Sequence, residues 1–189
     1  MKKNIGNYNA CFPTPIVVVG ALIDQKPNWF EVAWCGIGDR DIITLSVEEN
    51  HETCRGIFKE KVLSISLVDE NLLERADYVG IVSGKKADKS EVFAWTAGEL
   101  GAPIPQDAPV TMECELIDTY KEHGMCLLLC RVKNTYVEDA LLDEKQKPDY
   151  NLLKPVLFEP RFRYLLTGKD LGPCIQPGRA FQKQLAEKE

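Results

Sequence analysis

Two short clusters of small polar and cationic residues could do chemistry in this chain: Ser83–Ser90 (SGKKADKS) and Asn50–Thr53 (NHET). Each lies next to an apolar, strand-like run. Hydroxyls, glycine amides and lysine ammonium groups bind phosphate monoesters well, because a phosphate has several acceptor oxygens and about two negative charges. Two such clusters in an acidic protein predict a bound phosphorylated ligand, but they do not identify it.

Bulk composition restricts the classes of protein and of partner. A chain of 189 residues with 44% hydrophobic and 28% charged residues fits one globular domain, so we expect residues 1–189 to form a single unit. The formal net charge of −6 argues against nucleic-acid binding, which needs a basic face. The first apolar run, 16–23, is far shorter than the ~20 residues that span a bilayer. Tyr8, Asn9 and Pro13 interrupt the approach to this run, so we expect no signal peptide and a cytoplasmic protein without a membrane segment.

The cysteines do not predict a metal site or a disulfide framework. There are seven of them, scattered and without a Cys-x-x-Cys pair, and the whole chain has two histidines. Zinc-type spacing is therefore missing. We expect reduced thiols in a reducing compartment and no bound metal.

Short strands dominate the expected secondary structure. Apolar or alternating runs occupy 16–23, 30–34, 42–47 and 62–68. Two further runs, 110–117 and 125–132, flank the turn-like sequence 121–124 and predict a long hairpin. Helical spacing appears over 52–60 and 71–78, the second with an N-cap at Asp69, Asn71 or nearby. This pattern favours an antiparallel barrel with peripheral helices over a parallel α/β sheet.

Several common catalytic and nucleotide-binding motifs are missing. Gly36-Ile37-Gly38 lacks a third glycine and a following helix, so a Rossmann nicotinamide site is not expected. No Walker loop and no Gly-x-Ser-x-Gly is present. The sequence offers no dyad or triad, and we therefore expect no catalytic side chain.

The segment of about 155–182 is too apolar and aromatic to be a free tail. We expect it to pack either on the barrel of the same subunit or on a partner subunit.

Taken in order, the pieces of the chain resemble the flavin reductase-like family, with its flavoredoxin-type branch nearest. The resemblance rests on residues 13–19 (PTPIVVV), 27–36 (PNWFEVAWCG), 44–47 (TLSV) with 51–53 (HET), 83–89 (SGKKADK) and 177–181 (PGRAF). It implies a mainly β fold with peripheral helices, an antiparallel Greek-key FMN-binding split barrel. It also implies a homodimer with FMN at the subunit interface.

The resemblance assigns site residues as well. His51, Thr53, Ser83 and Lys89 would face the FMN phosphate, and the neighbouring Gly84 would also contact the cofactor. The ribityl chain and the isoalloxazine ring would be lined by Asn28, Ala33, Trp34, Cys35, Ser46 and Val47. Several have an ordinary alternative: Lys89 as a solvated lysine, Thr53 as a helix cap or first-turn residue, His51 as a surface group or cap, and Trp34 as a core or interface aromatic.

The resemblance implies an FMN-binding oxidoreductase. It would pass electrons between flavin and a donor, which is NADH, NADPH or a protein. A second interpretation is a flavoredoxin-like electron carrier, without enzymatic activity, that holds FMN tightly and docks a redox protein partner. A third is a binding module that uses the same barrel without flavin. The sequence does not separate NADH from NADPH, and it leaves the role of Cys35 open.

Overall fold

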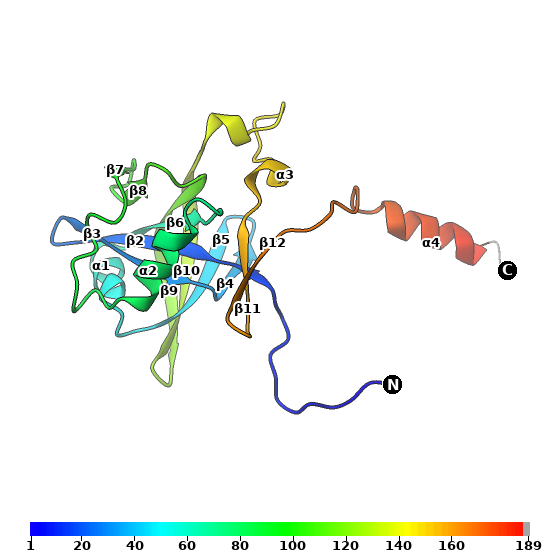
Figure 1. Cartoon of the computed structure of the whole chain (residues 1–189), viewed down its shortest axis with the longest axis horizontal. Coiled ribbons are helices and arrows are strands. Elements are labelled where there is room, and N and C mark those ends of the chain that lie inside the picture. The colour runs from blue at the N-terminus through cyan, green and yellow to red at the C-terminus, as the bar shows by residue number, and fades with distance from the viewer. Residues whose placement is uncertain (187–189) are drawn as a thin grey trace.

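One large antiparallel sheet forms the body of the protein. The computed structural model describes residues 1–186, and Figure 1 shows the arrangement of the elements. The sheet has seven strands in the order β3-β2-β6-β9-β10-β5-β4. These are β2 (Val17–Ile23), β3 (Lys26–Val32), β4 (Cys35–Asp39), β5 (Ile42–Glu48), β6 (Val62–Leu67), β9 (Val110–Glu122) and β10 (Met125–Val137). The prediction of a mainly β, antiparallel split-barrel fold is confirmed.

The sheet curls around an inner core. Phe30 and Val32 of β3 pack in the same buried cluster as Leu45 and Val47 of β5, although these strands lie near opposite edges of the sheet. Side chains on a strand point alternately to its two faces, so these residues lie on the inner face at every second position. Closure of the sheet around shared side chains makes it a barrel.

The intervening strand residues, whose side chains point away from the inner core, form a second core outside the barrel. Val18 of β2 and Trp29 of β3 pack there against Ala76 and Val79 of α2 (Leu73–Ile81). The Trp29 and Phe93 rings meet edge to face, with centroids 5.3 Å apart. Glu31 follows Trp29 by two residues, so its side chain points to the same face of β3, toward α2.

Two predicted elements match the structure closely. Helix α1 runs from Glu52 to Glu60, as its apolar spacing predicts. The long hairpin is confirmed as β9 and β10, joined at His123 and Gly124, whose φ angles of 50° and 83° suit a tight hairpin turn. The second helix begins two residues later than predicted, at Leu73, and the Leu72 amide donates to the Asp69 carboxylate.

Smaller elements complete the chain. A three-stranded sheet contains β1 (Thr14–Pro15), β11 (Val156–Glu159) and β12 (Arg163–Leu166), while β7 (Trp95–Ala97) pairs with β8 (Pro103–Pro105). The short helices are η1 (Asp139–Leu141) and α3 (Tyr150–Leu153), and α4 (Gln176–Ala186) is the last helix. No helix within residues 1–186 is long and apolar enough to cross a membrane.

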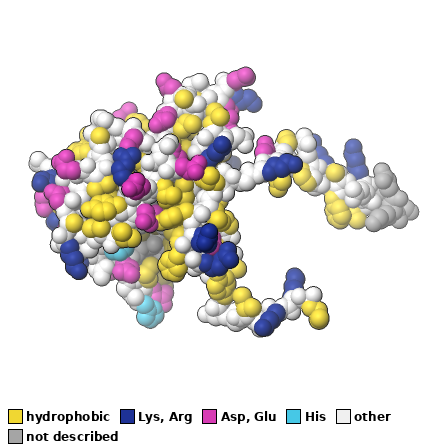
Figure 2. Space-filling view, in the orientation of Figure 1, with side chains coloured by type: hydrophobic (Ala, Val, Ile, Leu, Met, Phe, Trp, Pro, Cys, Tyr) yellow, Lys and Arg dark blue, Asp and Glu magenta, His cyan; other side chains and the backbone are white. Residues whose placement is uncertain are grey.

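Both ends of the chain project from the body (Figure 1). Val156 and Glu159 are buried on the barrel, but residues 161–186 are exposed. Figure 2 shows hydrophobic side chains along both projecting ends. The C-terminal segment is therefore buried on the barrel only at its start, although Tyr164 still contacts Glu31 and Asp77.

Candidate functional site

The start of α1 supplies hydrogen-bond donors beside the barrel. Strand β5 ends at Glu48, and the chain turns through Asn50 and His51 into the helix. His51 is the N-cap residue, and its side chain makes no capping hydrogen bond. Backbone N–H groups of the first turn have no partner within a helix, and the helix dipole makes this end attractive to anions. The sequence cluster Asn50–Thr53 is thus the uncapped N-terminus of a helix of nine residues.

Thr53 and Asn28 are linked at this point. Thr53 is buried, and its hydroxyl donates to Asn28 Oδ1 at 3.2 Å. An Asn side chain has one acceptor oxygen and an NH₂ donor. Because the oxygen is engaged by Thr53, the Asn28 amide presents its NH₂ group to its other neighbours.

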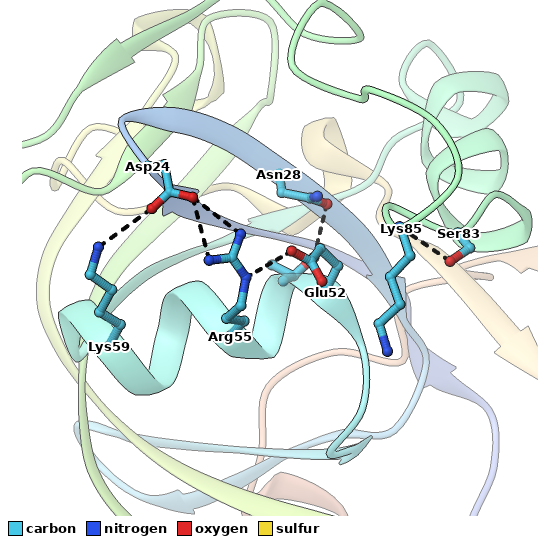
Figure 3. A network of polar contacts seen from close by, with 8 residues as sticks. Asp24, Asn28, Glu52, Arg55, Lys59, Ser83 and Lys85 are labelled. Atoms are coloured by element: carbon cyan, nitrogen blue, oxygen red, sulfur yellow. Dashed lines mark hydrogen bonds and ion pairs between the residues drawn. The ribbon is translucent and has the colours of Figure 1, made fainter.

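The loop after α2 packs directly on this amide. A Cβ atom at Gly84 would lie 2.6 Å from Asn28 Nδ2, so any side chain there would collide with Asn28. The loop is held by hydrogen bonds from the Lys86 and Ala87 amides to the Ser83 carbonyl, at 2.9 and 3.1 Å, and from the Lys85 amide to the Ser83 hydroxyl, at 3.3 Å. Figure 3 shows Asn28, Glu52 and Lys85 on the three segments that meet here.

Lys89 is a buried cation, with 4% of its surface exposed. Its ammonium group donates to the Trp29 carbonyl at 3.0 Å and to the Val79 carbonyl at 2.7 Å. An ammonium group has three N–H donors, so one is left for a ligand. Burial lowers the pKa of Lys89.

These groups surround two adjoining hollows. The first, of about 330 Å³ and called the polar hollow below, is lined by Asn28, Phe30, Glu31, residues 50–53, residues 79–85 and Lys89. The second, of about 260 Å³ and called the apolar hollow, is lined by residues 30–34, 46–48, His51 and Met125. Phe30, Glu31 and His51 line both. The two hollows therefore adjoin each other, and both lysines, Lys85 and Lys89, belong to the polar hollow.

The pKa values of His51 and Glu31, which line both hollows, are shifted from their ordinary values. Burial lowers the pKa of His51, Glu48 opposes this shift, and the positive charges of Lys89 and Lys85 lower the pKa further. Burial and the charge of Asp77 raise the pKa of Glu31 to about 7, with a partly opposing hydrogen bond from Tyr164. The polar hollow therefore has two lysine cations beside a neutral imidazole and a carboxyl group that titrates near neutral pH.

The structure brings ten of the eleven residues predicted for the site to these hollows. Asn28, His51, Thr53, Ser83, Gly84 and Lys89 line the polar hollow. Ala33, Trp34, Ser46 and Val47 line the apolar hollow. Cys35 lines neither of these two hollows; its side chain packs against the inner core, and burial raises its pKa to about 11.

Twelve lining residues were not predicted, among them Phe30, Glu31, Lys85 and Met125. Lys85 stands inside the SGKKADKS cluster, but the spacing does not separate it from its solvated neighbours. For Glu31, the available signal is a charged residue inside an otherwise apolar strand run. Its partners are distant in sequence, so the signal does not indicate a role.

In chemical terms the site suits an elongated ligand with an anionic group at one end and a flat apolar body at the other. The fold is an antiparallel β-barrel of the split-barrel class, and its candidate ligand site lies between the barrel, the start of α1 and the end of α2.

Comparison with known proteins gives the family. The model of the flavin reductase like domain matches residues 9–161. The flavoredoxin of Desulfovibrio vulgaris (Miyazaki F) is 30% identical, with 94% of this chain and 100% of that chain covered and a TM-score of 0.86. The flavoredoxin from Methanosarcina acetivorans is 26% identical, with 96% and 99% covered and a TM-score of 0.89. A comparison with curated proteins finds no match.

A more distant structure shares the fold. The FMN-binding protein from Thermus thermophilus, solved with bound 1-cyclohex-2-enone, is 21% identical over 92% of this chain and 97% of that chain, with a TM-score of 0.77. The chain belongs to the flavin reductase-like family, and the sequence-based resemblance is confirmed.

Proposed function

We propose that this protein binds FMN, with the phosphate in the polar hollow and the isoalloxazine ring in the apolar hollow, and that it functions as an oxidoreductase. The observation that carries the proposal is the joining of the two hollows at Phe30, Glu31 and His51, so that one molecule can occupy both.

The polar hollow fits a phosphate monoester. Its donors are the uncapped first turn of α1, the Asn28 amide, the Ser83 hydroxyl, the Lys85 ammonium and the third N–H of Lys89. Helix N-termini and lysine charges both favour a phosphate dianion. The Thr53 hydroxyl is engaged with Asn28, so Thr53 contributes its backbone N–H and positions the Asn28 amide.

The apolar hollow fits a flat ring system. Trp34 is 56% exposed there, beside Val47 and Met125. The Ser46 amide of β5 donates to the carbonyl of Trp34, the residue before β4, at 2.9 Å. This hydrogen bond helps to hold β4 and β5 in register. Aromatic and thioether side chains pack well against rings. When bound, the isoalloxazine accepts and releases the electrons, while the protein binds and orients it.

The electron donor separates two versions of the proposal. In the first, NADH or NADPH reduces the bound flavin directly and the protein is a flavin reductase. In the second, the protein is a flavoredoxin-like electron carrier, a version supported by its similarity to two flavoredoxins. A redox protein partner would then dock near the exposed Trp34, and the net charge of −6 would steer a basic partner.

We also propose a homodimer. The C-terminal segment exposes Phe162, Leu171, Ile175 and Phe181, with 90%, 90%, 70% and 61% of their surfaces accessible. Apolar side chains in this number on one projecting segment favour burial against a second copy. Sedimentation velocity tests this: we expect a dimer mass for the full chain, and a monomer at micromolar concentration would contradict it. A cytoplasmic location, where the seven free thiols would stay reduced, belongs to the same proposal.

Titration of the apoprotein with FMN and with riboflavin tests the ligand assignment. Riboflavin keeps the ring and the ribityl chain but lacks the phosphate. We expect FMN to bind at least about tenfold more tightly, the effect of roughly 1.4 kcal/mol of phosphate contacts. Equal affinities for FMN and riboflavin would show that the polar hollow does not bind the phosphate.

A further inference from the structure

Glu31 occupies the point where the two hollows meet. It lies in β3 between the inward-facing Phe30 and Val32 and lines both the polar and the apolar hollow. Its carboxyl group is pressed against the last turn of α2: a Cβ atom at Gly80 would lie 2.7 Å from Glu31 Oε2. The missing side chain at Gly80 therefore makes the space that the carboxyl group occupies.

Tyr164 connects Glu31 to a second carboxyl group. The Tyr164 hydroxyl lies 2.6 Å from Asp77 Oδ1 and 3.3 and 3.4 Å from the two oxygens of Glu31. A phenol has one hydrogen to donate. The shorter distance gives this hydrogen to Asp77, which leaves the hydroxyl oxygen as an acceptor for a protonated Glu31.

The hydrogen bonds among Glu31, Tyr164 and Asp77 are complete only when Glu31 carries a proton. With both carboxyl groups ionised, the charges repel and a single hydroxyl serves two acceptors. With Glu31 protonated, Glu31 donates to Tyr164 and Tyr164 donates to Asp77. Burial and the charge of Asp77 raise the pKa of Glu31 to about 7, while burial and the Asp77 hydrogen bond raise the pKa of Tyr164, so Tyr164 keeps its own proton.

Glu31 lines the polar hollow together with other charged groups. Asp77 and Tyr164 face Glu31 from α2 and β12, and the charged or titratable groups around the two hollows are Lys85, Lys89, His51, Glu52 and Glu48. Because Glu31 lines the polar hollow, an anionic ligand that enters this hollow repels the ionised carboxylate, and the protonated carboxyl becomes more stable.

We propose that Glu31 is a proton-binding residue of the ligand site, which takes up a proton when an anionic ligand enters the polar hollow. The inference rests on the proposed function, because it takes FMN as the anionic ligand. Coupling of this kind is reciprocal: a ligand that drives proton uptake binds less tightly as the pH rises.

Isothermal titration calorimetry of the full-length apoprotein with FMN measures the protons exchanged. Titrations at pH 7 in PIPES, HEPES and imidazole, which differ in ionisation enthalpy, give the number of protons taken up per FMN. We expect an uptake approaching about half a proton, because a carboxyl group with a pKa near the working pH is about half protonated before the ligand binds. The FMN phosphate ionises near pH 6 and contributes the same small release in every variant.

Three variants locate the proton. Glu31→Gln should abolish the uptake, while the control Glu91→Gln, at an exposed glutamate outside both hollows, should leave it unchanged. Asp77→Asn removes the charge that raises the pKa of Glu31, and it should move the pH of maximal uptake downward. A residue that only packs would not shift this pH profile.

The outcomes are distinct. FMN binding with equal proton uptake in the wild type and in Glu31→Gln, or with no uptake in the wild type, overturns the role of Glu31 and leaves the proposed function standing. Failure of FMN to bind the wild type overturns the proposed function and this inference together.

Discussion

The ammonium nitrogen of Lys89 lies 2.7 Å from the carbonyl oxygen of Val79, in the last turn of α2. The same nitrogen lies 3.0 Å from the carbonyl oxygen of Trp29 in β3. One side chain thus ties the helix to the barrel at the edge of the polar hollow. A lysine that the sequence indicates as a phosphate ligand is also part of the structure that shapes the site.

Replacement of Lys89 should therefore cost both stability and FMN retention. In Lys89→Ala, two buried carbonyl groups lose a charged donor, and we expect the free energy of unfolding to fall by about 2–3 kcal/mol. Lys86 is the matched control: it is exposed and lines a neighbouring hollow of about 350 Å³ but not the polar hollow. Lys86→Ala should change stability by less than ~0.5 kcal/mol and retain FMN.

Urea unfolding gives the stability difference, and FMN and riboflavin titrations separate the two roles of Lys89. A loss of affinity confined to FMN supports a phosphate contact. An equal loss for both ligands would mean that Lys89 is structural only, and equal FMN retention in Lys89→Ala and Lys86→Ala would remove it from the site.

Thr53 should act through the orientation of Asn28. Thr53→Val keeps the shape of the side chain but removes the hydroxyl that donates to Asn28 Oδ1. We expect a loss of about 1–2 kcal/mol in stability, because a buried acceptor is left unpaired, and an FMN affinity reduced by roughly tenfold. Thr53→Ser keeps the hydroxyl and should restore most of both. If serine behaves like valine, the hydroxyl has no such role.

Stability should fall with rising pH because of Glu31. The pKa of this carboxyl is about 7 in the folded protein and 4.5 as the ordinary value. A raised carboxyl pKa stabilises the fold fully below the unfolded value, and this stabilisation is lost as the pH rises through about 7. After allowance for solvent screening of a partly exposed group, the loss is on the order of 1–2 kcal/mol.

Urea unfolding of the wild type and Glu31→Gln from pH 4 to pH 8 checks this shift. The two curves should run together in acid, and the glutamine variant should become the more stable one above neutral pH. If the free energies of unfolding of the two proteins differ by a constant amount across this pH range, the titrating group is not Glu31.

Alkylation should distinguish the exposed thiols from Cys35. Burial raises the pKa of Cys35 to about 11, so almost no reactive thiolate is present at pH 8. Cys11 and Cys174 are exposed. Iodoacetamide on the native protein, followed by peptide mass spectrometry, should modify these two and spare Cys35. Modification of Cys35 at the rate of Cys174 would restore it as a candidate reactive thiol.

The sequence predicts local structure well where apolar spacing is strong. The spacing of Cys54, Ile57 and Phe58 predicts α1 at its observed bounds, because this face packs on the barrel. Strand β4 was not predicted, because it contains Gly36 and Gly38; pairing with β5 stabilises it as a strand. Its formation depends on the neighbouring strand rather than on its own propensity.

The site was predicted less completely, for a related reason. The phosphate-binding residue types are local signals, and they lie together as expected. By contrast, Tyr164 contacts Asp77 and Glu31 across 87 and 133 residues of sequence, and Lys89 reaches Trp29 across 60. Contacts of this separation follow from the barrel topology and have no local pattern. Lys89 as a structural tie and Glu31 as a site residue therefore become visible only in the fold.

The most direct test of FMN binding is an absorbance spectrum of the purified protein, continued anaerobically during titration with NADH and then NADPH. We predict flavin bands near equimolar with the protein. Rapid bleaching by one nicotinamide would assign the reductase role and its donor, whereas bands that persist under both would assign the electron-carrier role. A colourless protein that acquires no flavin bands after addition of FMN would contradict the proposed function.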